Sequence, residues 1–80
     1  MSKFDAIYEF LRGRSGPIGF SLDDLSNAIP GGLPNSAYDW KIWWNNEDVS
    51  HSQSRSWGRA GYDAQPDLAG RKVRFVPKSG

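Results

Sequence analysis

The stretch FSLDDLSNAIPGGLPNSAYDWKIWWN, residues 20–45, decides the fold of this 80-residue chain. It contains two segments of helical periodicity, separated by the breaker run Pro30-Gly31-Gly32. The first segment spans residues 22–29, follows the N-cap candidate Ser21 and places three apolar side chains on one face: Leu22, Leu25 and Ile29. The stretch therefore predicts two helices joined by a tight turn.

The second segment predicts a helix over residues 35–45, beginning where Asn35 follows Pro34. At 100° per residue, Ala37, Trp40 and Trp44 lie within about 60° of one another and should face the core. The opposite arc of this helix should face outward, and it carries Tyr38, Lys41, Ile42 and Asn45.

Weaker patterns flank this pair of helices. Periodic apolar residues predict a first helix over residues 3–12, followed by a short extended segment at 18–20. Ser50 and Gln53 have capping-box spacing for a fourth helix over residues 51–60. Residues 62–76 then predict a β-hairpin, whose first strand contains Pro66 and should lie at an edge of the sheet.

Together these elements predict a single α+β domain over residues 1–80. Two helices joined by a short turn containing glycine, followed by a hairpin, are the parts of a winged helix-turn-helix. We therefore expect a helix-rich, winged helix-turn-helix-like fold with four helices, a short strand and a C-terminal β-hairpin. The extra helix before the hairpin departs from the simplest form of this fold. Aromatic packing should hold the core together, with three buried indoles: Trp40, Trp44 and Trp57.

Composition narrows the possible functions. The chain has no cysteine, which excludes disulfides, thiolate metal sites and cysteine nucleophiles and is typical of a reducing compartment. We find no export signal and no apolar run of about 20 residues, so we expect a cytoplasmic protein with no membrane partner. Residues 1–50 carry four basic and seven acidic side chains, a balance of −3, whereas residues 51–80 carry six basic and two acidic ones, a balance of +4. The basic part can attract phosphates.

The predicted outward arc of the third helix has the chemistry of a reader of the DNA major groove. Asn45 can pair with adenine and Lys41 with guanine, while apolar groups such as Ile42 can touch thymine methyls. Phosphate contacts would come from the fourth helix and the hairpin tip, through His51, Ser52, Arg55, Arg59, Arg71, Lys72 and Arg74. The alternative interpretation is structural: Tyr38 and Ile42 pack under the hairpin, and the charges are solvated or block edge pairing.

Catalysis finds little support in the sequence. His51 is the only histidine, so no site with several histidine ligands can form. Glu47, Asp48 and His51 could hold a metal in a small nuclease, but the same residues also make an ordinary polar loop. We expect no catalytic residues, no metal and no cofactor.

The sequence resembles a small bacterial family of uncharacterised domains, which occur as stand-alone proteins and as fused modules. The resemblance covers nearly the whole chain and rests on the segment 33–37, Trp43-Trp44-Asn45-Asn46, His51-Ser52-Gln53, Trp57, Gly61 and Val73-x-Phe75. It implies that Trp44, Asn45, His51 and Gln53 form a shared unit in a winged-helix-like domain. It implies no activity. Ser54 departs from the alanine that is common in the family.

The sequence thus predicts a module that binds double-stranded DNA, with the third helix in the major groove and the basic C-terminal third on phosphates. Such a protein could serve in transcription regulation or as an accessory protein. One alternative is a protein-interaction module, such as an inhibitor or antitoxin-like partner, that uses the Tyr38/Ile42 face. A small metal-dependent nuclease around His51 is the other. The oligomeric state stays open.

Overall fold

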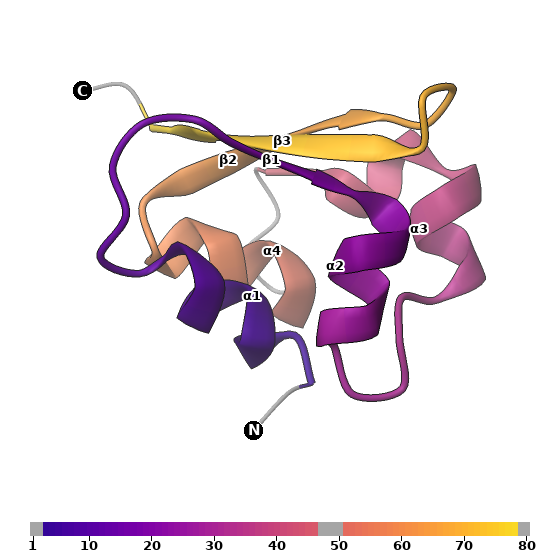
Figure 1. The fold of residues 1–80 in the computed structure, drawn as a ribbon, viewed down its shortest axis with the longest axis horizontal. Coiled ribbons are helices and arrows are strands. Elements are labelled where there is room, and N and C mark those ends of the chain that lie inside the picture. Colours follow the sequence, from indigo (N-terminus) through magenta and orange to yellow (C-terminus); the bar gives the residue numbers. More distant parts are fainter. Residues whose placement is uncertain (1–2, 47–50, 79–80) are drawn as a thin grey trace.

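The computed structural model describes residues 3–46 and 51–78, and within them the chain has an α+β fold (Figure 1). The predicted class, with four α-helices and a C-terminal hairpin, is confirmed. In chain order the elements are α1 (Asp5–Leu11), β1 (Ile18–Ser21), α2 (Leu22–Ala28), α3 (Asn35–Asp39), the 3-10 helix η1 (Lys41–Trp44), α4 (Ser52–Arg59), β2 (Tyr62–Asp67) and β3 (Lys72–Pro77).

The three strands form one antiparallel sheet in the order β1-β3-β2. All the helices lie on the same side of this sheet (Figure 1). On the central strand, Val73 pairs with Phe20 of β1, and Phe75 pairs with Ala64 of β2. Val73 and Phe75 are buried under the helices, whereas Lys72 and Arg74 are exposed. The alternation along β3 therefore leaves the basic side chains Lys72 and Arg74 on the uncovered outer face of the sheet.

The turn between α2 and α3 follows the local signals. Ser21 caps α2 because its hydroxyl accepts a hydrogen bond from the Asp24 amide at 3.0 Å. Gly31 and Gly32 have φ values of 77° and 76°, a left-handed conformation that suits glycine. A Cβ at Gly32 would lie 2.8 Å from the Ser26 hydroxyl oxygen, which accepts a hydrogen bond from the Leu33 amide. Close packing as well as conformation therefore requires glycine here.

The predicted single helix over residues 35–45 is wrong. The α-helix ends at Asp39, Trp40 is extended at φ −125° and ψ 115°, and the chain continues as η1. In a continuous helix the Ala37 carbonyl would accept a hydrogen bond from the amide of Lys41. Here the Trp44 indole nitrogen donates to that carbonyl at 2.9 Å. A side chain from the following segment thus satisfies the end of α3.

Stacked indoles form the centre of the core. The rings of Trp44 and Trp57 are stacked, with centroids 5.6 Å apart and an angle of 21° between their planes, and both lie near Phe75 of the sheet. Their predicted burial is confirmed. The predicted burial of Trp40 is wrong, because its side chain is 64% exposed. The break in the helix turns Trp40 outward and brings Trp43 against Trp44 instead, with centroids 4.7 Å apart.

The fourth helix lies close to its predicted position, spanning Ser52–Arg59, and His51 occupies the N-cap position. The predicted cap, Ser50, lies outside the described residues. The main-chain carbonyl of His51 accepts hydrogen bonds from the Ser54 hydroxyl at 3.2 Å and from the Arg55 amide at 3.0 Å. These bonds fix the first turn of the helix.

We expect Trp44→Ala and Trp57→Ala each to lower the free energy of unfolding by about 3–5 kcal/mol, because each leaves a large cavity in the core. Trp40→Ala is the matched control and should change it by less than about 0.5 kcal/mol, because this indole lies on the surface. Urea denaturation followed by circular dichroism measures all three. A loss for Trp40→Ala as large as the other two would contradict the broken helix.

Candidate nucleic-acid interface

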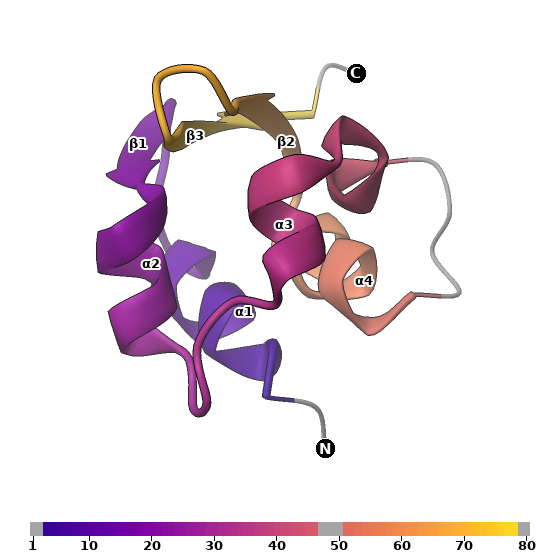
Figure 2. The same ribbon diagram turned by 90° about the vertical axis from the view of Figure 1, so that its right-hand side faces the viewer.

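The tip of the hairpin docks on the helical layer through Arg71. The guanidinium carbon of Arg71 lies 5.0 Å from the centre of the Tyr38 ring on α3. One of its terminal nitrogens lies 3.5 Å from a carboxylate oxygen of Asp23 on α2. Figure 2 shows the hairpin turn above α2 and α3, which agrees with these contacts. The hairpin and the third helical segment therefore belong to one end of the molecule.

Arg71 adopts an uncommon backbone conformation. With φ at 53°, it is the one non-glycine residue with a positive φ among residues 3–46 and 51–78. The turn is closed by a hydrogen bond from the Arg71 amide to the Leu68 carbonyl at 3.1 Å, and by one from the Gly70 amide to the Asp67 carboxylate at 3.0 Å. A non-glycine residue in this region costs on the order of 1 kcal/mol. The tip thus holds a cation over α3 despite a backbone penalty.

Two further cations of the hairpin stand on the uncovered face of the sheet. Arg74 lies across from Gly19 on one side and Gln65 on the other, and Lys72 is its neighbour along the strand. Lys72 and Arg74 line a shallow hollow on this face together with Arg71 at the tip. The Lys72 ammonium nitrogen lies 4.0 Å from a carboxylate oxygen of Asp67, but both side chains are more than half exposed. Solvent weakens such exposed pairs.

A second hollow lies between η1 and β2. Lys41, Ile42 and Asn45 line it from η1 and the following residue, and Asp63 and Lys78 lie on the opposite side. The Lys78 ammonium is 2.9 Å from the Asp63 carboxylate. Pro66 lines both hollows, so they are neighbours across β2.

Seven of the residues singled out in the sequence therefore lie in one region, which we call the hairpin surface: Tyr38, Lys41, Ile42, Asn45, Arg71, Lys72 and Arg74. They do not form the outward arc of one helix, as predicted, because the chain breaks at Trp40. Tyr38 and Asn45 are half-buried, whereas Ile42 is 75% exposed. The β2–β3 hairpin contributes as much to this surface as the third helical segment does.

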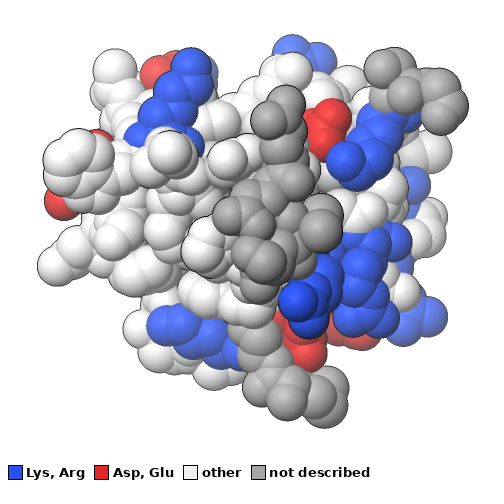
Figure 3. All heavy atoms as spheres, turned by 180° about the vertical axis from the view of Figure 1, so that it is seen from behind, with Lys and Arg blue, Asp and Glu red and all other residues white. Residues whose placement is uncertain are grey.

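The remaining four residues, His51, Ser52, Arg55 and Arg59, lie on α4 or at its start. Arg59 lies over the Tyr8 ring of α1, with its guanidinium carbon 4.8 Å from the ring centre, and Arg12 approaches the same ring at 6.0 Å. The view from behind shows basic side chains gathered on the α1 and α4 side (Figure 3). The predicted binding residues are therefore divided between the hairpin surface and α4.

Sequence reasoning missed the exposure of Trp40, which precedes Lys41 of the hairpin surface in the chain. Trp40 was assigned to the core, yet it separates α3 from η1 and is exposed. A signal did exist, because Ile42, Trp43 and Trp44 are weaker helix formers than alanine or leucine. Such a run favours the end of a helix as much as its continuation.

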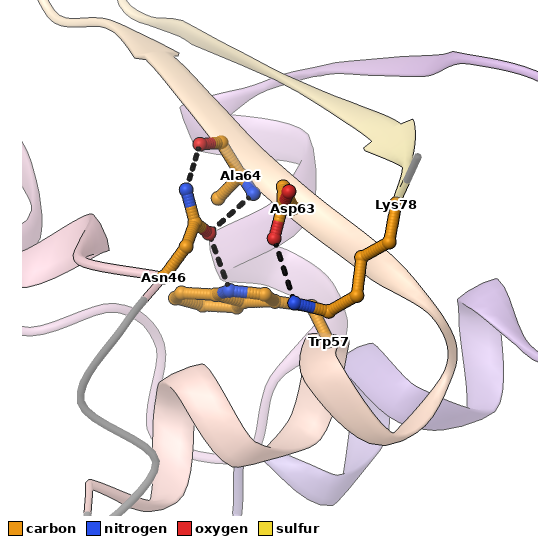
Figure 4. A network of polar contacts seen from close by, with 5 residues as sticks. All are labelled: Asn46, Trp57, Asp63, Ala64 and Lys78. Carbon is orange, nitrogen blue, oxygen red and sulfur yellow. Dashed lines mark hydrogen bonds and ion pairs between the residues drawn. The ribbon is translucent and has the colours of Figure 1, made fainter. Parts of the chain in front are cut away.

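Asn46 ties η1 to the hairpin and to α4 (Figure 4). Its side-chain oxygen accepts hydrogen bonds from the Trp57 indole at 2.9 Å and from the Ala64 amide at 2.7 Å. Its side-chain nitrogen donates to the Ala64 carbonyl at 2.9 Å. Asn46 is thus the side chain that links the Trp57 indole to β2, and the grouping of Asn45 that the resemblance implies stays a prediction. Gln53 does join this region, since its side-chain nitrogen lies 3.4 Å from the Trp43 carbonyl, to which it donates.

Within the described residues, no group of three or more His, Asp or Glu side chains could hold a metal ion. Glu47 and Asp48, which the nuclease hypothesis requires, lie outside the described residues. In the same described part of the chain, no helix has the length and apolar character needed to span a membrane.

The architecture defines a small α+β domain with a basic hairpin docked on its third helix. The chain belongs to the family described as Domain of unknown function (DUF7662), whose model matches residues 4–79. No curated protein and no solved structure matches the chain. The expected membership of a small uncharacterised domain family is confirmed.

Asn46→Ala should lower the free energy of unfolding by about 2–4 kcal/mol, because it leaves the Trp57 indole N–H and the Ala64 amide without an acceptor. Asn27→Ala, an exposed change on α2, is the control and should cost less than about 0.5 kcal/mol. Thermal and urea denaturation of both variants tests this. Equal losses would show that Asn46 has no special role.

Proposed function

We propose that this domain binds double-stranded DNA through the hairpin surface. The observation that carries the proposal is the contact of Arg71 with Tyr38, because it joins the cations of the hairpin to the third helical segment in one surface. Three cations follow one another there at short spacing: Arg71, Lys72 and Arg74. Cations at this spacing suit the phosphates of a duplex, whose neutralisation releases bound counterions.

The order of the elements supports the same proposal. A strand between the first two helices, two helices joined by a tight turn, and a hairpin whose second strand pairs with that first strand are features of a winged helix-turn-helix. In this interpretation the β2–β3 hairpin is the wing. The 3-10 helix η1 and the helix α4 are additions to the simple pattern.

The broken helix changes the proposed role of the third segment. Only five residues, Asn35–Asp39, are α-helical, so this segment is too short to present four base-reading side chains in one line. Lys41 and Ile42 are exposed on η1 and remain candidates for contact with base edges. We propose that phosphate contacts supply most of the affinity and that sequence preference is low.

The arginines of α4 have a secondary role in this proposal. Arg59 stacks on Tyr8 of α1, so it lies with the N-terminal helix and not with the hairpin. Arg55 and Arg59 would then add long-range attraction for DNA with fewer direct contacts.

A protein partner is the second candidate, and the exposure of Trp40 and Ile42 favours it. They are the large hydrophobic side chains that stand exposed among the described residues, at 64% and 75%. They are two positions apart in the chain, and exposed apolar surface often marks a binding site. The salt dependence of the binding affinity distinguishes the two candidate partners, because the affinity of an apolar interface falls little as ionic strength rises.

Duplex DNA binding should weaken steeply with salt. Three phosphate contacts predict a slope of log K against log salt of about −2.7, which is about a 40-fold weakening between 50 and 200 mM salt. Fluorescence anisotropy with a labelled random duplex measures it. A salt-independent affinity, or none at 50 mM, would refute the proposal.

Arg71→Gly separates binding from folding. Glycine adopts the backbone conformation of Arg71 without strain, so the melting temperature should change little. Affinity for all duplexes should fall, and the salt slope should become shallower by about one unit. Arg55→Ala, on α4, should have a smaller effect. If Arg71→Gly bound DNA like the parent protein while Arg55→Ala did not, the interface would lie on α4.

A further inference from the structure

Trp40 and Ile42 precede and follow Lys41 of the hairpin surface, and both present apolar side chains to solvent. In the described part of the chain the remaining large apolar side chains are buried or partly buried against the core. A tryptophan side chain can bury on the order of 150–250 Å², so leaving one outside gives up much of the stabilisation available to a domain of this size. This exposure calls for a physical role.

The fold holds Trp40 in this exposed place. The Trp44 indole satisfies the Ala37 carbonyl on one side of the break. On the other side, the Trp40 carbonyl accepts a hydrogen bond from the Trp43 amide at 3.1 Å. Since Trp44 is stacked on Trp57 in the core, a buried side chain holds the backbone before Trp40, and a main-chain hydrogen bond holds the backbone after it. The indole therefore projects from a rigid support.

The surroundings of Trp40 combine apolar and cationic groups. Lys41 separates it from Ile42 in the sequence, and Tyr38, two residues before it, lies under Arg71. Asp39 is the one acidic side chain in the segment 38–42. Aromatic faces next to cations suit nucleic acid, because bases stack on the ring while the cations meet phosphates.

The small exposed apolar area of Trp40 and Ile42 favours nucleic acid over a protein as their binding partner. A specific protein interface of standard size buries about 800 Å² on each partner. Two side chains supply well under that area, and Lys41, the residue between them in the chain, is a cation. One or two apolar side chains are, by contrast, enough to open a base step in DNA.

We propose that Trp40, assisted by Ile42, inserts between base pairs and kinks the duplex held by the hairpin surface. This inference rests on the proposed DNA binding and adds a mode of recognition to it. Specificity would then come from the ease of unstacking, so flexible pyrimidine–purine steps and mismatched sites should bind more tightly than stiff A-tracts.

The test uses the full chain with a 20-base-pair duplex that carries a donor and an acceptor dye at its ends. The parent protein should increase energy transfer on binding, and more so when a central mismatch is present. Trp40→Ala should remove this increase and weaken binding by about 5- to 150-fold, the range that corresponds to the loss of one stacked base. Trp40→Phe should restore most of both. Asn35→Ala, an exposed change at the start of α3, should leave both unchanged.

Tryptophan fluorescence gives a second readout that a structural effect would not produce. Binding should quench the parent emission and should quench it less in Trp40→Phe, because Trp44 and Trp57 are buried. Unchanged melting temperatures would show that the variants are folded. The parent protein could bind duplex DNA without a change in energy transfer, and Trp40→Ala could bind equally well. That result would refute the insertion of Trp40 between base pairs and leave the proposed DNA interface standing. If the parent binds no duplex, both proposals fall.

Discussion

The stacking of Trp44 on Trp57 is the contact on which the rest of this structure depends. It joins η1 to α4, and both rings lie near Phe75 on the central strand of the sheet. The polar edges of the same two indoles are also used, since Trp44 donates to the Ala37 carbonyl and Trp57 donates to Asn46. One pair of rings thus fixes the end of α3, the course of η1 and the attachment of β2. In a chain of this length without disulfides, a few large aromatic contacts can supply much of the stability.

The same contact explains the unusual exposure of Trp40. To place the Trp44 indole on the Ala37 carbonyl and on Trp57, the chain leaves the α-helix after Asp39. Trp43 is brought into the aromatic group and Trp40 is turned out. The surface indole is therefore a consequence of how the core closes. The placement of Trp44 in the core therefore also determines the exposed position of Trp40, the residue that we propose to contact DNA.

The sheet places charge on the opposite side from the core. Because β3 is central and alternates strictly, burial of Val73 and Phe75 commits Lys72 and Arg74 to the uncovered face. The tight turn then directs Arg71 toward α2 and α3. The hairpin contributes three cations to one end of the molecule, whereas the arginines of α4 remain beside α1.

The sequence by itself determined much of the secondary structure, because the interactions that set it lie between residues close together in the chain. The helix predicted over residues 22–29, its Ser21 cap, the glycine turn and the C-terminal hairpin all follow from neighbouring residues, and the structure contains each of them, with the helix at Leu22–Ala28. The sequence also placed Trp44 and Trp57 in the core. Tertiary contacts decided the course of residues 35–45, because periodicity assumes a continuous helix and cannot anticipate an indole seven residues away replacing a backbone donor. For the same reason the role of Asn46 as a linking amide, and the separation of Arg59 from the hairpin, depended on which elements lie side by side in the folded chain.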